Sequence, residues 1–125
     1  MKKIMPRGDF WSLMSGLIES RKVMGVVEHS PGHYKFDQLA SVDDVPGDYR
    51  PTALPPKKYV LPQLEPLLRF DRNTGEAVVV QEADDVVLFG VRPCDITGMA
   101  MLTERMADGD ADPHFKARRE KKKKR

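Results

Sequence analysis

The sequence predicts an α+β or α/β fold: a mixed sheet of about five strands, an N-terminal helix, and a helix that follows the central strand. Apolar residues recur at helical spacing over residues 9–21 and 95–107, and short apolar runs bounded by turn residues lie between them. Five prolines in residues 51–66 exclude a long helix there. The 125 residues suit one small domain, which we expect over residues 1–115.

The first predicted elements are a helix and a β-hairpin. Asp9 is placed to cap the helix. The helix has an apolar stripe, widened by Trp11, that consists of Phe10, Leu13, Met14, Leu17 and Ile18. Strands are predicted at Val23–Glu28 and His33–Phe36, because the intervening His-Ser-Pro-Gly segment supplies turn residues.

The second half of the chain predicts another hairpin, a strand and a helix. Strands at residues 67–71 and 77–81 flank the turn segment Arg72–Gly75. The β-branched run Val86–Val91 is typical of a strand buried on both faces. A helical face follows, and Gly109 is expected to stop its helix; the face consists of Ile96, Met99, Ala100, Leu102 and Met106.

The corner between the strand at residues 86–91 and the following helix is the candidate site. Pro93 ends the strand, Asp95 is placed to cap the helix, and Cys94, the single cysteine, lies between them beside Arg92. Ligands of open α/β sheets bind at the carboxyl ends of strands, and a helix N-terminus next to a cation favours a thiolate. A lone cysteine is as often an inert, buried residue, so both interpretations stay open.

Other chemistries find less support in the sequence. One cysteine excludes an internal disulfide framework and any iron–sulfur site made only of this chain's thiolates. The Asp-x-Asp-x-Asp run at residues 108–112 lacks the glycine and the acidic twelfth ligand of a calcium loop, because Pro113 and Arg119 stand there. Without a Gly-rich phosphate loop or a spaced carboxylate pair, the sequence does not predict an independent enzyme.

Charge separates the C-terminal segment from the rest. Residues 116–125 carry eight Lys or Arg and one Glu, whereas the whole chain has a net charge of +2. The body is therefore mildly acidic, which argues against nucleic acid as its partner. The segment is predicted to be a frayed helix or disordered. The N-terminus does not resemble a signal peptide and no run suits a membrane span, so we expect a cytoplasmic protein.

Three segments together resemble one known family. They are residues 55–70 (PPKKYVLPQLEPLLRF), 89–102 (FGVRPCDITGMAML) and 112–120 (DPHFKARRE). In this order and spacing they are similar to the iron–sulfur β-subunits of cytoplasmic sulfhydrogenases and related nickel–iron hydrogenases, together with the A-type subunits of anaerobic sulfite reductases. The resemblance covers most of residues 10–120.

The resemblance implies an electron-transfer context. In that family an N-terminal α/β domain precedes a ferredoxin-like region with two [4Fe–4S] clusters, which pass electrons between a flavin-bearing subunit and a catalytic subunit. Cys94 matches the family's Arg-Pro-Cys-Asp cysteine by position, which makes it a candidate single cluster ligand, with Arg92 and Asp95 beside it. The family's further cysteines have no counterpart after Glu120.

The chain is accordingly expected to be a docking or scaffold domain that is truncated before the cluster-binding region and holds no cofactor alone. Two alternatives stay open. In one, the basic segment at residues 116–125 binds nucleic acid or an acidic partner. In the other, the chain is a non-functional gene remnant.

Overall fold

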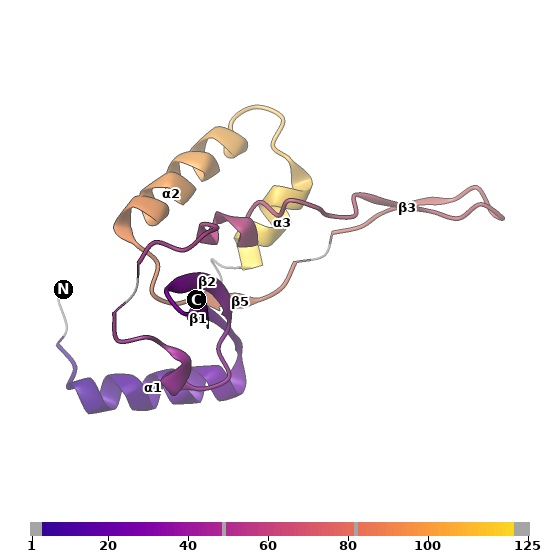
Figure 1. The fold of residues 1–125 in the computed structure, drawn as a ribbon. Helices are drawn as coiled ribbons and strands as arrows, with labels where there is room; N and C mark the ends of the chain where they lie inside the picture. Colours follow the sequence, from indigo (N-terminus) through magenta and orange to yellow (C-terminus); the bar gives the residue numbers. More distant parts are fainter. Residues whose placement is uncertain (1–3, 49, 82, 122–125) are drawn as a thin grey trace. The chain divides into compact units, whose positions relative to one another are not determined.

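The fold is α+β, as the sequence predicts (Figure 1). The computed structural model describes residues 4–48, 50–81 and 83–121. Within these residues it has three α-helices and five strands, and the strands form a three-stranded and a two-stranded sheet. The chain divides into two compact units, Met1–Pro55 with Val86–Val91, and Pro56–Asp85 with Arg92–Arg125. The single domain expected over residues 1–115 stays a prediction.

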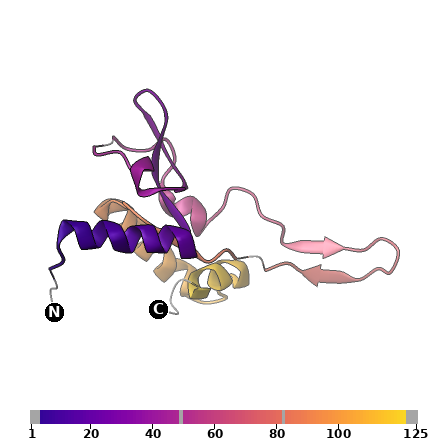
Figure 2. The same cartoon turned by 90° about the horizontal axis from the view of Figure 1, so that it is seen from below.

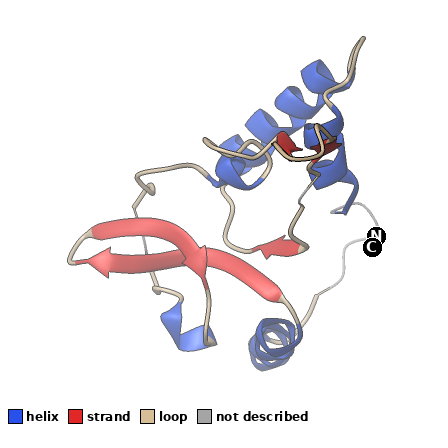
Figure 3. Ribbon diagram, turned by 90° about the vertical axis from the view of Figure 1, so that its right-hand side faces the viewer, coloured by secondary structure: helices blue, strands red, loops and turns tan. Residues whose placement is uncertain are grey.

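The first unit is built on a mixed three-stranded sheet in the order β2-β1-β5 (Figure 3). The central strand β1 (Lys22–Ser30) pairs antiparallel with β2 (His33–Gln38) and parallel with β5 (Val86–Leu88). Parallel neighbours need a long crossover connection, and here that connection includes residues 56–85 of the second unit.

The tight turn between β1 and β2 is the one that the sequence predicts. Gly32 has a φ of 74°, a conformation that favours glycine. Its backbone N–H donates to Oε1 of Glu28 at 2.9 Å, and a register irregularity lies between Glu28 and Ser30. A residue with a Cβ atom would be strained at this position of the turn.

The core of the first unit joins helix α1 (Arg7–Ser20) to the sheet. Met14, Val23 and Leu39 form its buried centre. Phe10, Trp11 and Phe89 pack edge to face or tilted around it, with ring centroids 5.3–6.3 Å apart. Of the predicted stripe, Leu13 is 50% exposed, because α1 turns a narrower face to the sheet than its sequence suggests.

Two predicted features of these elements are wrong. Helix α1 begins at Arg7, with Pro6 as its N-cap residue, so Asp9 lies in the first turn and is not the cap. Strand β5 spans only Val86–Leu88, and of these Val86 is buried while Val87 and Leu88 are half-buried, so the two faces of this short strand are only partly covered. The predicted burial on both faces does not occur.

The second unit contains one hairpin and two helices (Figure 2). A short 3₁₀-helix η2 (Pro56–Tyr59) precedes β3 (Leu68–Phe70) and β4 (Ala77–Val79), which pair antiparallel. Asp71 accepts from Asn73 N–H at 2.7 Å, and Gly75 has a φ of 73°, so the predicted turn is confirmed. Helix α2 (Pro93–Ala107) ends before Gly109, which has a φ of 67°.

The predicted apolar face of α2 is only partly covered within its unit. Met99, Leu102 and Met106 are half-buried. Ile96 is 55% exposed, and Ala100 is also exposed. The helix is therefore present as predicted, but a continuous buried stripe along it is not.

Most of the described C-terminal segment is a helix. Helix α3 (Pro113–Lys121) includes residues 116–121, which agrees with the helical alternative of the prediction for this part of the tail. Two of its side chains, Phe115 and Arg118, are 3% and 6% exposed. Their burial stabilises a helix that apolar periodicity alone does not predict. Residues 122–125 of the predicted tail lie outside the described residues.

The described helices also bear on membrane insertion. None of them combines the length and the apolar composition that crossing a bilayer requires.

Close packing at Gly25 gives a test of the first unit's core. A Cβ atom there would lie 2.8 Å from Cδ1 of Leu39, which is 2% exposed. We expect Gly25→Ala to lower the free energy of unfolding by about 1–3 kcal/mol, because buried Leu39 has little room to move. Gly16→Ala is the control: its Cβ meets nothing within 4 Å in α1, and we expect a gain of about 0.5–1 kcal/mol. Urea unfolding measures both, and equal stability of Gly25→Ala and the wild type would contradict this packing.

Candidate functional site

The predicted corner at residues 92–95 forms the start of α2. Arg92 is the N-cap residue and Pro93 occupies the first helical position, where its missing N–H costs little. The N–H groups of Asp95 and Ile96 donate to the Arg92 carbonyl at 3.0 and 3.1 Å. Asp95 is therefore a first-turn acid, favourable to the helix dipole, and its predicted role as the cap is wrong.

The thiol of Cys94 is exposed at this helix start. The burial that the alternative interpretation expected for this cysteine is thereby wrong, whereas the reactivity of the thiol stays a prediction. Arg92, Cys94 and Asp95 are consecutive or nearly so along the chain, and the structure keeps them together in one turn at the beginning of α2. Their role in cofactor binding stays a prediction.

The donor groups do not fit the [4Fe–4S] cluster that the resemblance implies for the family. Such a cluster takes about four thiolates, and the chain has one cysteine. In the described ranges, no three His, Cys, Asp or Glu side chains lie close enough to hold a metal ion.

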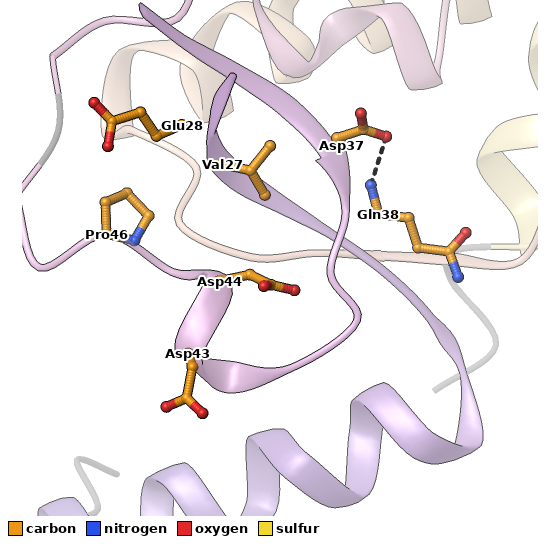
Figure 4. Close-up of a pocket in the computed structure, with 7 residues that line it drawn as sticks. All are labelled: Val27, Glu28, Asp37, Gln38, Asp43, Asp44 and Pro46. Carbon is orange, nitrogen blue, oxygen red and sulfur yellow. Dashed lines mark hydrogen bonds between the residues drawn. The ribbon is translucent and has the colours of Figure 1, made fainter. Parts of the chain in front are cut away.

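An acidic pocket of about 470 Å³ lies in the first unit (Figure 4). Figure 4 shows Asp37 and Gln38 at the end of β2, with Asp43 and Asp44 on the neighbouring short helix. Its lining residues are Val27, Glu28, Asp37, Gln38, Asp43, Asp44 and Pro46. Sequence reasoning missed this pocket, because its acids come from three separate segments.

The carboxylates of the acidic pocket already have hydrogen-bond partners. Asp44 Oδ2 accepts from the N–H groups of Ala40 and Ser41 at 2.8 and 2.9 Å, completing a capping box with Ser41. Asp37 accepts from Gln38 N–H and pairs with Lys35 Nζ at 2.7 Å. These contacts account for the acids as local stabilisers of a turn and a strand end. The Ser-x-x-Asp spacing at residues 41–44 was the available sequence signal.

The second unit has a buried arginine at its centre. Arg118 Nε donates to the Val60 carbonyl at 2.9 Å, and Nη1 pairs with the Glu65 carboxylate. Sequence reasoning missed this residue because it stands in a run of basic residues, whose usual position is in solvent. The only signal was the spacing of Phe115 and Arg118, which puts both on one side of a helix.

His114 adds a second link between the same segments. Its Nε2 lies 3.3 Å from the Leu67 carbonyl. Two of the three resemblance segments, residues 55–70 and 112–120, are thus joined by contacts of Arg118 and His114. In this chain the two segments therefore pack against each other.

Asp112 caps α3 and has a shifted pKa. Its Oδ1 accepts from His114 N–H at 2.9 Å, and its carbonyl accepts from Lys116 N–H at 3.0 Å. Burial by itself raises the pKa of Asp112, but hydrogen bonds from the His114 and Phe115 backbone and from the His114 ring outweigh it and hold the pKa below 3.8.

Comparison with known proteins supports the relationship that the motifs indicate. The chain is 33% identical over 110 residues to sulfhydrogenase 2 subunit beta of Pyrococcus furiosus. The match covers 88% of this chain and 32% of that protein, so the chain spans about a third of its relative's length. No family model and no solved structure matches the chain. The similarity thus supports the resemblance to hydrogenase β-subunits over most of the chain.

The buried pair gives a test of the second unit. We expect Arg118→Met to lower the free energy of unfolding by about 3 kcal/mol, because it removes a buried hydrogen-bond donor and leaves Glu65 without its partner. Arg105→Met, at an exposed cation near the end of α2, is the matched control and should change it by less than about 0.5 kcal/mol. Urea unfolding of both variants and of Glu65→Gln measures the effects, and an Arg118→Met protein as stable as the control would refute the contact.

The Asp112 cap predicts a pH dependence. The lowered pKa means that ionised Asp112 stabilises the fold above pH 3.8, and that this stabilisation is lost as the pH falls through the folded-state pKa. We expect Asp112→Ala to lower the free energy of unfolding by about 1 kcal/mol at pH 6, and by progressively less below pH 3.8. Asp112→Asn keeps an acceptor that does not titrate, so its capping should not vary in this window. Unfolding at several pH values measures this, and an Asp112→Ala effect independent of pH would contradict it.

Proposed function

We propose that this chain is a non-catalytic docking or scaffold region of an electron-transfer oxidoreductase subunit, of the hydrogenase or sulfite reductase type. Flavin-bearing and catalytic subunits are its proposed partners. The observation that carries the proposal is the similarity to sulfhydrogenase 2 subunit beta over 88% of the chain. The cytoplasmic location expected from the sequence stays a prediction.

An exposed apolar face on the β3–β4 hairpin supports a docking role. Residues opposite each other in an antiparallel pair lie on one face, and the register pairs Leu68 with Val79 and Phe70 with Ala77. Leu68 and Phe70 are each 63% exposed, and Val79 is 54% exposed. A two-stranded hairpin is marginally stable alone, and a partner that covers this face would stabilise it.

The exposed position of Cys94 is compatible with contact to a partner. Under this proposal Cys94 is the one thiol that the chain offers, and Arg92 and Asp95 lie in the same helical turn. Any further thiolates of a cluster come from other polypeptide. The proposal requires only that this turn be reachable, and the exposed thiol meets that condition.

Fewer charges of the basic segment at residues 116–125 are available for binding than its composition suggests. Arg118 is 6% exposed and is paired with Glu65, so its charge serves the packing of the second unit. Binding of nucleic acid or an acidic partner through residues 116–125 stays a prediction, and no observation on the described residues favours it over docking. A gene remnant is likewise a prediction, which cooperative unfolding of the chain would contradict.

Docking can be tested on the hairpin face. The chain is co-expressed with candidate flavin-bearing and catalytic oxidoreductase subunits, and complex formation is measured by size-exclusion chromatography and calorimetry. We expect Phe70→Ser to weaken association by at least about tenfold, because it removes a large apolar side chain from the exposed face. Val78→Ser, on the opposite face, is the matched control.

Association that is equally strong in both variants would remove the hairpin from the interface. Failure of every candidate subunit to associate with the wild type would count against the docking function itself.

A further inference from the structure

The helices α2 and α3 of the second unit enclose a pocket of about 200 Å³ that the proposed function does not use. Its lining residues are Thr103, Met106, Ala107, Ala111, Phe115, Lys116 and Arg119. Residues three and four apart share one side of a helix, so residues 103, 106 and 107 present one side of α2. Residues 115, 116 and 119 present one side of α3.

One polar group in this pocket lacks a partner. The Nε of Arg119 is buried and has no hydrogen-bond partner among the residues that the structure describes. Nη2 of the neighbouring Arg118 is also buried without a partner, but Arg118 does not line this pocket, and its Nε donates to the Val60 carbonyl at 2.9 Å. A buried guanidinium N–H without an acceptor has lost its hydrogen bond to water, and no hydrogen bond within the protein compensates this desolvation cost. An acceptor that a ligand brought to the Arg119 guanidinium would offset part of this cost.

The other lining side chains define the chemistry of that acceptor. Lys116 and Arg119 bring two positive charges, which favour an anion. Met106, Ala107, Ala111 and Phe115 form an apolar wall. Asp108 and Asp110, in the connection between the helices, do not belong to the lining. An anionic head with an apolar stem fits both parts.

Size and geometry favour a carboxylate over a larger anion. A cavity of about 200 Å³ equals the liquid volume of roughly seven water molecules, enough for a head group and a stem of a few carbons. The planar guanidinium matches the two oxygens of a carboxylate. A doubly charged phosphate would have to leave water for a pocket whose walls are largely apolar.

We infer that this pocket binds an organic carboxylate with a short apolar stem: Arg119 and Lys116 hold the carboxylate, and Met106 and Phe115 contact the stem. A free short-chain carboxylic acid and the C-terminal carboxylate of a polypeptide ending in an apolar residue offer the same chemistry. The inference is independent of the docking proposed above, because it uses no residue of the β3–β4 hairpin or of the Cys94 turn.

The experiment titrates hexanoate into the full chain and follows backbone amides and arginine Nε–H signals by NMR. We expect saturable shifts at Arg119 Nε–H and at residues 103–107 and 115–119, with a Kd on the order of 1 mM. Hexanol and hexylammonium, which keep the stem but lack the carboxylate, should bind at least about tenfold more weakly. No saturable shift with hexanoate, or equal binding of hexanol, would overturn the inference.

Variants separate the pocket from general charge effects. We expect Arg119→Met to weaken hexanoate binding by at least about tenfold, and Arg119→Lys to restore part of it, because lysine keeps the charge and loses the planar fork. Arg105→Met is the matched control and should leave binding unchanged. If Arg119→Met does not fold, Lys116→Met provides the same comparison. Equal losses in the pocket variant and in the control would contradict a specific site.

A further arm distinguishes the two sources of the carboxylate. A tripeptide ending in leucine is compared as free acid and as C-terminal amide. Tighter binding of the free-acid peptide than of hexanoate identifies a polypeptide end as the ligand, and the reverse order identifies a free acid. Inorganic phosphate that binds as tightly as hexanoate would refute a carboxylate site.

Discussion

The second unit depends on one buried guanidinium. Arg118 lies on helix α3, which is mostly charged and has one large apolar side chain, Phe115. Arg118 donates to the Val60 carbonyl and pairs with the Glu65 carboxylate. A buried charge is tolerated only when a partner compensates it, and here the Glu65 carboxylate and the Val60 carbonyl do so. Helix α3 and the proline-rich segment before β3 are therefore ordered by each other, and neither would be expected to keep its conformation alone.

The first unit is held together by a different force. Its sheet and α1 bury a small apolar centre between them. Strand β5 belongs to this sheet, although residues 56–85, which precede it in the sequence, belong to the second unit. The parallel pairing of β5 with β1 thus couples two distant parts of the sequence. Because β5 is short, few hydrogen bonds hold it against β1. The Phe89 N–H adds one beyond the end of the strand by donating to the Met24 carbonyl at 2.8 Å.

The candidate binding features are distributed unequally between the two units. The first carries an acidic pocket whose carboxylates are already used by backbone N–H groups and by Lys35. The second carries the exposed hairpin, the Cys94 turn, and the pocket beside Arg119. Exposed apolar strands and an unsatisfied buried donor are both incomplete as they stand. We therefore expect the second unit to be the part of the chain that binds other molecules.

The sequence by itself determined the α+β class, the helices α1 and α2, and both hairpins with their glycine turns, because apolar periodicity and turn residues are local properties. The three motifs likewise indicated the relationship that the comparison with the sulfhydrogenase subunit supports. Only the tertiary structure decided that residues 113–121 are helical and that Arg118 is buried while Cys94 is exposed. Burial depends on partners distant along the chain, such as Val60 and Glu65, and no local pattern specifies such partners.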